Sequence, residues 1–199
     1  MKRIDAVRAV AAVTRAEDLF VGSVGPLRDD WWNERPGADE GVHNTFSPAI
    51  LGSVTPTALG LALALPHRRV VAIDTDGSML MNTGALCALG RERPRNLTVI
   101  VLDNEIYESS GGQPTHTAAG VDLALMAQGA GCINCATVGD TTSLRARAAL
   151  LLDDGEFGLL VAKLEPGAHR WPEELRRPFD GVEDKYGFRR HIRSSEHHS

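Results

Sequence analysis

The 199-residue chain has few cysteines, few aromatic residues, no excess of positive charge and no long apolar run. Three cysteines cannot form a disulfide framework or supply the thiolates of a four-cysteine iron–sulfur cluster. Aromatic residues make up 5% of the chain and the formal net charge is −5, so we expect no nucleic-acid partner. No apolar run reaches the roughly 18 residues of a membrane-spanning helix, so we expect no membrane association.

The first 20 residues have a basic start and an apolar middle, as a secretory signal peptide does. Charged side chains at Arg8, Arg15 and Glu17 interrupt that apolar middle at helical spacing. We therefore predict a short amphipathic helix at this end of the chain and a cytoplasmic protein.

Short apolar runs alternate with helical patterns along the chain. We predict strands near 18–22, 69–74, 97–102, 135–138 and 158–164, with helices between most of them. The alternation indicates an α/β fold: a single doubly wound domain with a mostly parallel sheet of about five to six strands flanked by helices. This domain is expected to span residues 1–165, and the charged segment 166–199 is expected to be a partly disordered C-terminal extension.

Two of the predicted strands end in acidic turns, at residues 74–78 and 103–107. Asp76 and Asn104 are 28 positions apart, which corresponds to one strand–helix–strand step. Because ligands bind at the carboxyl ends of parallel strands, we expect these two side chains to converge on one ion. Carboxylate, amide and carbonyl oxygens suit Mg²⁺, and a helix beginning near Ser78 favours an anion. The pattern therefore predicts a magnesium ion beside a diphosphate group.

These residues resemble the diphosphate-binding motif of thiamine diphosphate-dependent enzymes, whose usual form is Gly-Asp-Gly-Ser followed, after a similar spacer, by Asn-Asn. Residues 73–117 are most similar to the sulfopyruvate and phosphonopyruvate decarboxylases, including the beta subunits of the former. Thr75 stands where the motif has its first Gly, and Asp103 where it has its first Asn.

The resemblance implies a role for three groups of residues. Mg²⁺ would be bound by the side chains of Asp76 and Asn104 and by the carbonyl of Ile106. Thiamine diphosphate would be bound by a larger set, which comprises Ser23, Gly25, Gly52, Ser53, Val54, Asp76, Gly77, Ser78, Asn104, Ile106 and Tyr107. Candidates for catalytic contact with the substrate lie in the following Gly-rich loop, at Gln113, Thr115 and His116.

Enzymes of this family also need a glutamate that activates the aminopyrimidine ring and lies on a separate pyrimidine-binding domain. Only 75 residues precede Asp76, and the diphosphate-binding domain uses them. We therefore expect a pyrimidine-binding, alpha-type partner subunit to supply the glutamate, in a hetero-oligomer of α2β2 or larger composition.

The resemblance implies a carboxy-lyase that acts on a small anionic 2-oxo acid similar to sulfopyruvate or phosphonopyruvate. Two alternatives use the same cofactor for carboligation or for oxidation of a 2-oxo acid. A third alternative is a non-catalytic binding or regulatory module, which Thr75 and Thr55 would favour because the family usually has Gly at both positions.

Overall fold

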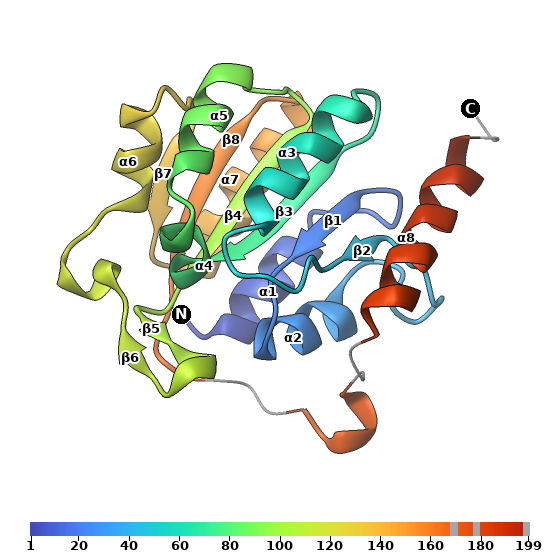
Figure 1. The fold of residues 1–199 in the computed structure, drawn as a ribbon, viewed down its shortest axis with the longest axis horizontal. Helices are drawn as coiled ribbons and strands as arrows, with labels where there is room; N and C mark the ends of the chain where they lie inside the picture. The colour runs from blue at the N-terminus through green and yellow to red at the C-terminus, as the bar shows by residue number, and fades with distance from the viewer. Residues whose placement is uncertain (168–170, 177–179, 197–199) are drawn as a thin grey trace.

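A computed structural model describes residues 1–167, 171–176 and 180–196. Six strands form one parallel sheet in the order β2-β1-β3-β4-β8-β7 (Figure 1). The strands are β1 (Leu19–Gly22), β2 (Thr45–Phe46), β3 (Val70–Thr75), β4 (Leu97–Asp103), β7 (Cys135–Val138) and β8 (Gly158–Lys163). The predicted doubly wound α/β fold is confirmed, and each of the five predicted strands is present.

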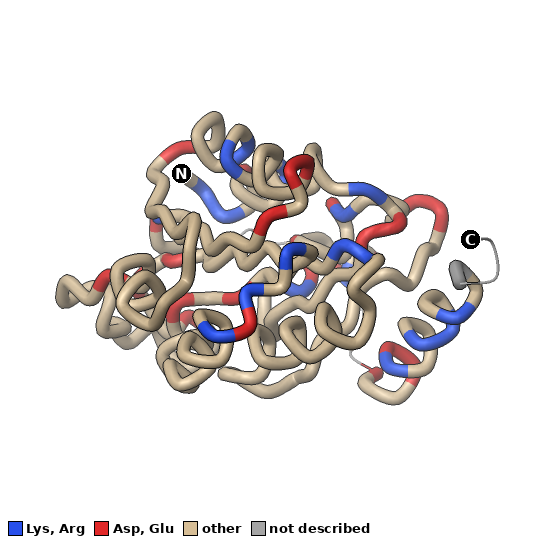
Figure 2. The backbone as a smooth tube through the Cα atoms, turned by 90° about the horizontal axis from the view of Figure 1, so that it is seen from above, with Lys and Arg blue, Asp and Glu red and all other residues tan. Residues whose placement is uncertain are grey.

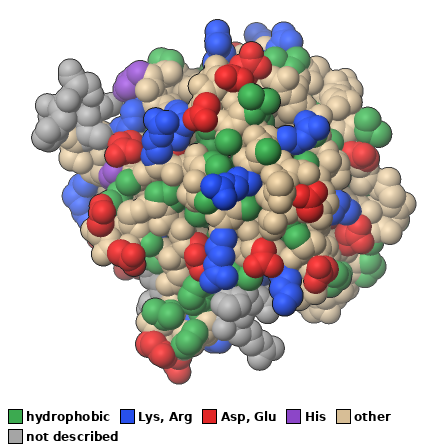
Figure 3. Space-filling model, turned by 180° about the vertical axis from the view of Figure 1, so that it is seen from behind, with side chains coloured by type: hydrophobic (Ala, Val, Ile, Leu, Met, Phe, Trp, Pro, Cys, Tyr) green, Lys and Arg blue, Asp and Glu red, His purple; other side chains and the backbone are tan. Residues whose placement is uncertain are grey.

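Helices cover both faces of the sheet. One face carries α3 (Val54–Ala64), α5 (Gly84–Glu92) and α6 (Leu123–Gly129), and the other carries α1 (Arg3–Ala11), α2 (Pro26–Glu34) and α7 (Thr141–Asp154). Seen from behind, Lys and Arg side chains are intermixed with Asp and Glu (Figure 3). In the described part of the chain, no helix has the length and apolar character needed to cross a membrane.

The central strands are apolar along their whole length because each face of the sheet has its own core. In β3, Val70 and Ala72 pack into the cluster beneath α3 and α5, whereas Val71 and Ile73 pack into the cluster beneath α1 and α7. Successive side chains of a strand point to opposite faces, so a strand covered on both sides shows no polar alternation. This explains why continuous apolar runs marked these strands in the sequence.

Residues 26–50, where the sequence pattern predicted no strand, contain both α2 and the edge strand β2. Pro26 at the start of α2 is compatible with a first helical turn, and Trp31 fixes the helix against the sheet. The indole of Trp31 is buried against Phe20 and donates to Thr45 Oγ1 at 3.2 Å. A mostly polar helix held by one large side chain gives little periodic signal, so the sequence pattern missed it.

Two short helices, α4 (Asp76–Met81) and α5, connect β3 to β4. The chain breaks at Asn82, whose φ of −145° is not helical and whose side chain donates to the Gly52 carbonyl at 2.9 Å. This hydrogen bond ties the end of α4 to the 50–53 turn.

The C-terminal segment contains a helix, α8 (Gly181–Glu196), which contacts the edge strand β2. This helix carries Lys and Arg as well as Asp and Glu residues (Figure 2). Phe188 stacks on Phe46 at a ring-centroid distance of 5.9 Å, and Gly187 passes close to His43. Segment 166–199 was expected to be a partly disordered extension, and within it residues 168–170, 177–179 and 197–199 lie outside the described residues. The division of the chain at residue 165 stays a prediction.

The strand order reverses between β1 and β3. From β1 the chain goes outward to β2 and then returns to place β3 on the other side of β1. Ligands of open α/β sheets bind in the crevice that such a reversal creates at the carboxyl ends of the strands. At that end of the sheet lie α4, the short antiparallel pair β5 (Ile106–Tyr107) and β6 (Gln113–Pro114), and the N-terminus (Figure 1).

Candidate functional site

A pocket opens at the reversal point, above the carboxyl ends of β1, β3 and β4. Its lining includes seven residues that the sequence predicted to contact the cofactor or its metal: Ser23, Asp76, Gly77, Ser78, Asn104, Ile106 and Tyr107. The two acidic turns, separated in sequence by α4, α5 and β4, therefore face one pocket.

The first acidic turn begins α4 and lies under an aromatic ring. The Thr75 side chain caps α4 by accepting from the Ser78 backbone N–H at 3.4 Å. A Cβ at Gly77 would lie 2.6 Å from Cε1 of Tyr107, so the ring contacts the backbone there directly. Ser78 is fully buried, and its hydroxyl accepts from the Gly52 N–H at 3.0 Å. This segment therefore has little freedom to move.

Asp76, the predicted metal ligand, is buried and held by two hydroxyls. Thr115 Oγ1 donates to Asp76 Oδ2 at 2.7 Å, and Thr117 Oγ1 lies 3.3 Å from the same oxygen. Burial raises the pKa of Asp76, and the nearby Asp103 carboxylate raises it further, against the effect of the Thr115 hydrogen bond. A divalent cation beside this carboxylate would offset both effects.

A lysine compensates the charge of Asp103 at the end of β4. Lys163 Nζ lies 2.9 Å from Asp103 Oδ2 and 2.5 Å from Glu105 Oε1. Burial acts to lower the pKa of Lys163, but the hydrogen bonds to these two carboxylates raise it overall. Thr117 Oγ1 lies 2.8 Å from Asp103 Oδ1, so one hydroxyl links the lysine–aspartate pair to Asp76.

The second acidic turn has an unusual backbone. Glu105 adopts a φ of +64°, a left-handed conformation that costs energy in a residue with a side chain. Its N–H donates to Asp103 Oδ1 at 3.2 Å, its carbonyl accepts from the Thr115 N–H at 2.8 Å, and the Asn104 side chain accepts from the Ile106 N–H. The turn presents Asn104 and Ile106 on the pocket side, as a metal site built from both requires.

The other predicted residues do not line this pocket. Gly52 adjoins it through the contact with Ser78, and Gly25, with a φ of +77°, faces Ser109. Ser53 precedes α3, and Val54 is buried in the core beneath that helix.

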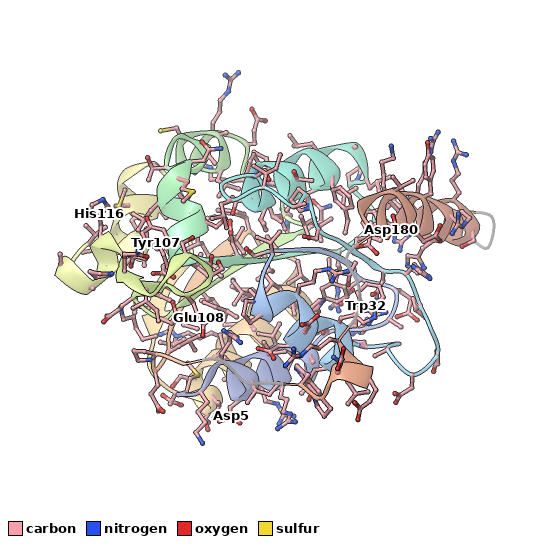
Figure 4. All side chains as sticks on the ribbon, turned by 60° about the horizontal axis from the view of Figure 1, so that its bottom comes forward. Asp5, Trp32, Tyr107, Glu108, His116 and Asp180 are labelled. Carbon is pink, nitrogen blue, oxygen red and sulfur yellow. The ribbon has the colours of Figure 1, made fainter. Side chains whose placement is uncertain are left out.

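The three catalytic candidates separate into two groups. Thr115 is buried against Asp76, whereas Gln113 in β6 and His116 at the start of the following 3-10 turn are both exposed. In Figure 4, His116 lies farther toward the outside of the molecule than Tyr107 and Glu108.

Sequence reasoning missed two charged residues of the pocket, Arg3 and Glu108. Arg3 begins α1 and is 5% exposed, and no periodicity or motif distinguishes it from the other arginines of that helix. Glu108 follows directly after the predicted residues 104–107, so its place next to them in the sequence could have identified it as a pocket residue. Both enter the site through packing between elements far apart in sequence.

The lining suits a diphosphate held with a hard cation. The buried hydroxyl of Ser23 has no hydrogen-bond partner among the described residues, although it lines the pocket.

No group of three or more His, Cys, Asp and Glu side chains could hold a metal ion in the described part of the chain. The predicted magnesium set does not need one, since it combines one carboxylate, one amide and one backbone carbonyl with phosphate oxygens.

Fold and site together define a doubly wound α/β domain with a pocket at a sheet reversal, lined by residues of the predicted diphosphate motif. Residues 38–161 match the model of the thiamine pyrophosphate enzyme C-terminal TPP-binding domain. The chain belongs to this family of thiamine diphosphate (thiamine pyrophosphate) enzymes, in agreement with the resemblance found in the sequence.

Two curated relatives and one solved structure illustrate the similarity. The sulfopyruvate decarboxylase subunit beta of Methanocaldococcus jannaschii is 28% identical over 83% of this chain and 85% of the relative. Phosphonopyruvate decarboxylase of Streptomyces viridochromogenes is 37% identical over 65% of this chain, which spans only 32% of that relative. A thiamin diphosphate-dependent enzyme structure from Mycobacterium smegmatis superposes with a TM-score of 0.71 at 24% identity, over 84% of this chain and 32% of that one. The solved structure shares the fold.

Proposed function

We propose that this chain is the diphosphate-binding subunit of a two-chain thiamine diphosphate-dependent 2-oxo acid decarboxylase. The observation that supports this most directly is the convergence of Asp76, Asn104 and Ile106 on one pocket at the sheet reversal. The two side chains and the Ile106 carbonyl would bind Mg²⁺. The turns at 23–25 and 77–78 would hold the diphosphate.

When bound, thiamine diphosphate supplies the electron sink that makes loss of CO₂ from a 2-oxo acid possible. The residues of this chain place and shield that group. Thr115 and Thr117 orient Asp76 toward the metal, so we assign Thr115 a positioning role through its bond to Asp76. Apolar side chains in the lining, including Leu51, Leu102 and Leu164, exclude water from the bound diphosphate.

Gln113 and His116 are proposed to meet the substrate. Both are exposed on the loop after the metal turn, and each side chain can donate a hydrogen bond to an anionic group. They would come within reach of substrate when a second subunit covers this end of the sheet. The proposed substrate is a small 2-oxo acid with a second anionic group, in line with the names of the curated relatives.

A partner subunit would cover the pocket and supply the activating glutamate. The M. jannaschii relative, of which this chain covers 85%, is itself named a beta subunit. Next to the pocket, the side chains of Ile50 and Met81 are 67% and 57% exposed. A Cβ at Gly52 would lie 3.4 Å from the Met81 Cβ, so these two exposed side chains border one turn. Apolar side chains at the mouth of a cofactor pocket suit a subunit interface.

The test is to assemble the chain with its partner and titrate Mg²⁺ and thiamine diphosphate while CO₂ and products are measured. An aldehyde from sulfopyruvate or phosphonopyruvate is expected, whereas an acyloin or an acid would favour carboligation or oxidation. Asp76→Asn should abolish cofactor binding, and Asp39→Asn, which changes an exposed carboxylate in a loop, should not. A wild-type assembly that binds no thiamine diphosphate would refute the proposal.

A further inference from the structure

Arg3 is the only Lys or Arg among the described residues that line the cofactor pocket. It begins α1, which covers the sheet face opposite α3 and α5, and it lines the pocket at the carboxyl ends of the strands. Its side chain is 5% exposed, so the guanidinium is buried rather than solvated. A buried arginine without a full set of acceptors needs an explanation.

Two carboxylates fix the orientation of the Arg3 guanidinium. Its Nε donates to Asp30 Oδ2 at 2.6 Å, and its Nη1 donates to Glu108 Oε2 at 2.5 Å. Asp30 belongs to α2, is fully buried, and also accepts from the Trp171 indole at 2.8 Å. The acceptors come from separate elements, so the guanidinium plane has little freedom to turn.

The third nitrogen, Nη2, is buried and has no hydrogen-bond partner among the described residues. It is the remaining donor of a side chain that lines the same pocket as Asp76, Ser78 and Asn104. Ser23 Oγ, also without a partner in the described part of the chain, lines that pocket as well. Two buried donors of different chemistry thus border one pocket.

We propose that Arg3 binds the diphosphate of the cofactor through Nη2, with Asp30 and Glu108 holding the guanidinium in place. This inference rests on the proposed cofactor site and adds a binding residue outside the family motif. A bound diphosphate carries several negative charges, and one Mg²⁺ with Asp76 does not neutralise them. A guanidinium presents fixed donors that match phosphate oxygens, which an ammonium group would not do as well.

The alternative is that Arg3 only joins α1, α2 and the turn at Glu108. The two roles differ in what they predict for ligands with and without phosphate. A purely structural arginine would change stability and affect all ligands alike. A phosphate-binding arginine would affect ligands in proportion to their phosphate content.

The experiment measures Mg²⁺-dependent binding of inorganic pyrophosphate, thiamine diphosphate and unphosphorylated thiamine to the chain assembled with its partner, by calorimetry. Arg3→Gln is expected to weaken pyrophosphate and thiamine diphosphate binding at least about tenfold and to leave any thiamine binding unchanged. Arg8→Gln is the matched control, because Arg8 lies on the same helix, is 54% exposed and pairs with Glu34. It should change pyrophosphate affinity less than about twofold.

Arg3→Lys provides a second reading if Arg3→Gln does not fold. It keeps the positive charge but removes the Nη2 donor, so pyrophosphate and thiamine diphosphate should bind several-fold more weakly and any thiamine binding should be unchanged. Unchanged pyrophosphate binding in a folded Arg3→Gln or Arg3→Lys would overturn the inference. If the wild-type chain, assembled with its partner, binds neither pyrophosphate nor thiamine diphosphate, the proposed cofactor site itself fails.

Discussion

The substitution Gly77→Ala tests how tightly the site is packed, because even the added methyl group should disturb the contact with Tyr107. An added Cβ would lie 2.6 Å from Cε1 and 2.7 Å from Cδ1 of Tyr107. Carbon atoms of non-bonded groups prefer separations of about 3.5–4.0 Å. In Gly77→Ala, the Tyr107 ring would therefore have to move by about 1 Å away from the start of α4.

The expected cost follows from two opposing effects. Overpacking of this size destabilises proteins by about 1–3 kcal/mol. Alanine in place of glycine inside a helix contributes about 0.5–1 kcal/mol in the opposite direction, and Gly77 lies within α4. The net loss should be about 1–2 kcal/mol, which corresponds to roughly 2–8 °C in the unfolding midpoint for a chain of this size.

The assay is urea unfolding of the full chain, paired with a binding titration of thiamine diphosphate in the presence of Mg²⁺. Gly60→Ala is the matched control, since Gly60 lies within α3 and its Cβ would meet nothing within 4 Å. The same substitution should stabilise the chain there by about 0.5–1 kcal/mol. A loss of stability in Gly77→Ala together with a gain in Gly60→Ala would identify the Tyr107 contact as the cause.

The double variant sharpens this test. In a Tyr107→Ala background the obstructing ring is gone, so Gly77→Ala should become neutral or stabilising. If Gly77→Ala stabilises the wild-type chain as much as Gly60→Ala does, the argument that the ring packs directly on this backbone is wrong.

Three further predictions concern charge and packing. Protons should compete with Mg²⁺ for Asp76, because the pKa of this carboxyl is raised above the ordinary 3.8. As the pH is lowered, the Mg²⁺ affinity measured by calorimetry should therefore begin to fall at a higher pH than it would for an ordinary aspartate. Unchanged affinity down to about pH 4 would contradict this. Lys163→Met should destabilise the chain by about 2 kcal/mol in urea unfolding by leaving buried Asp103 uncompensated, and adding Asp103→Asn should restore most of the loss. Gly90→Ala should cost more than about 2 kcal/mol, because its Cβ would lie 1.9 Å from the Ala130 carbonyl oxygen; a variant as stable as wild type would refute this contact between α5 and α6.

The strands of the central sheet were predictable because burial on both faces leaves a continuous apolar run. Leu97–Asp103 illustrates this, since every one of its residues is buried. The meeting of the two acidic turns was predictable because Asp76 and Asn104 each follow such a strand, and parallel strands bring their carboxyl ends to one edge. Here the local sequence pattern and the topology of the sheet both indicate the carboxyl ends of β3 and β4.

Other features depend on contacts that no local pattern records. The break between α4 and α5 follows from the hydrogen bond of Asn82 to the Gly52 carbonyl, a residue 30 positions away. Arg3 enters the pocket because its acceptors, Asp30 and Glu108, lie 27 and 105 positions along the chain. Such contacts become visible only when the folded chain brings the elements together.

The departures from the family motif have partners in the structure. Thr55 Oγ1 donates to Asp74 Oδ2 at 2.7 Å, which supplies a hydrogen bond to a carboxylate that is 1% exposed. Burial raises the pKa of Asp74, so a glycine at position 55 would leave a less favourable charge in the core.

Thr75 and Asp103 fit the same explanation. Thr75 caps α4 through its side chain, and Asp103 is paired with Lys163. Each of these side chains therefore stabilises the turn in which it lies, whether or not a cofactor is bound. Because Thr55 and Thr75 have such structural roles, their departure from the family motif is not by itself evidence for a non-catalytic module.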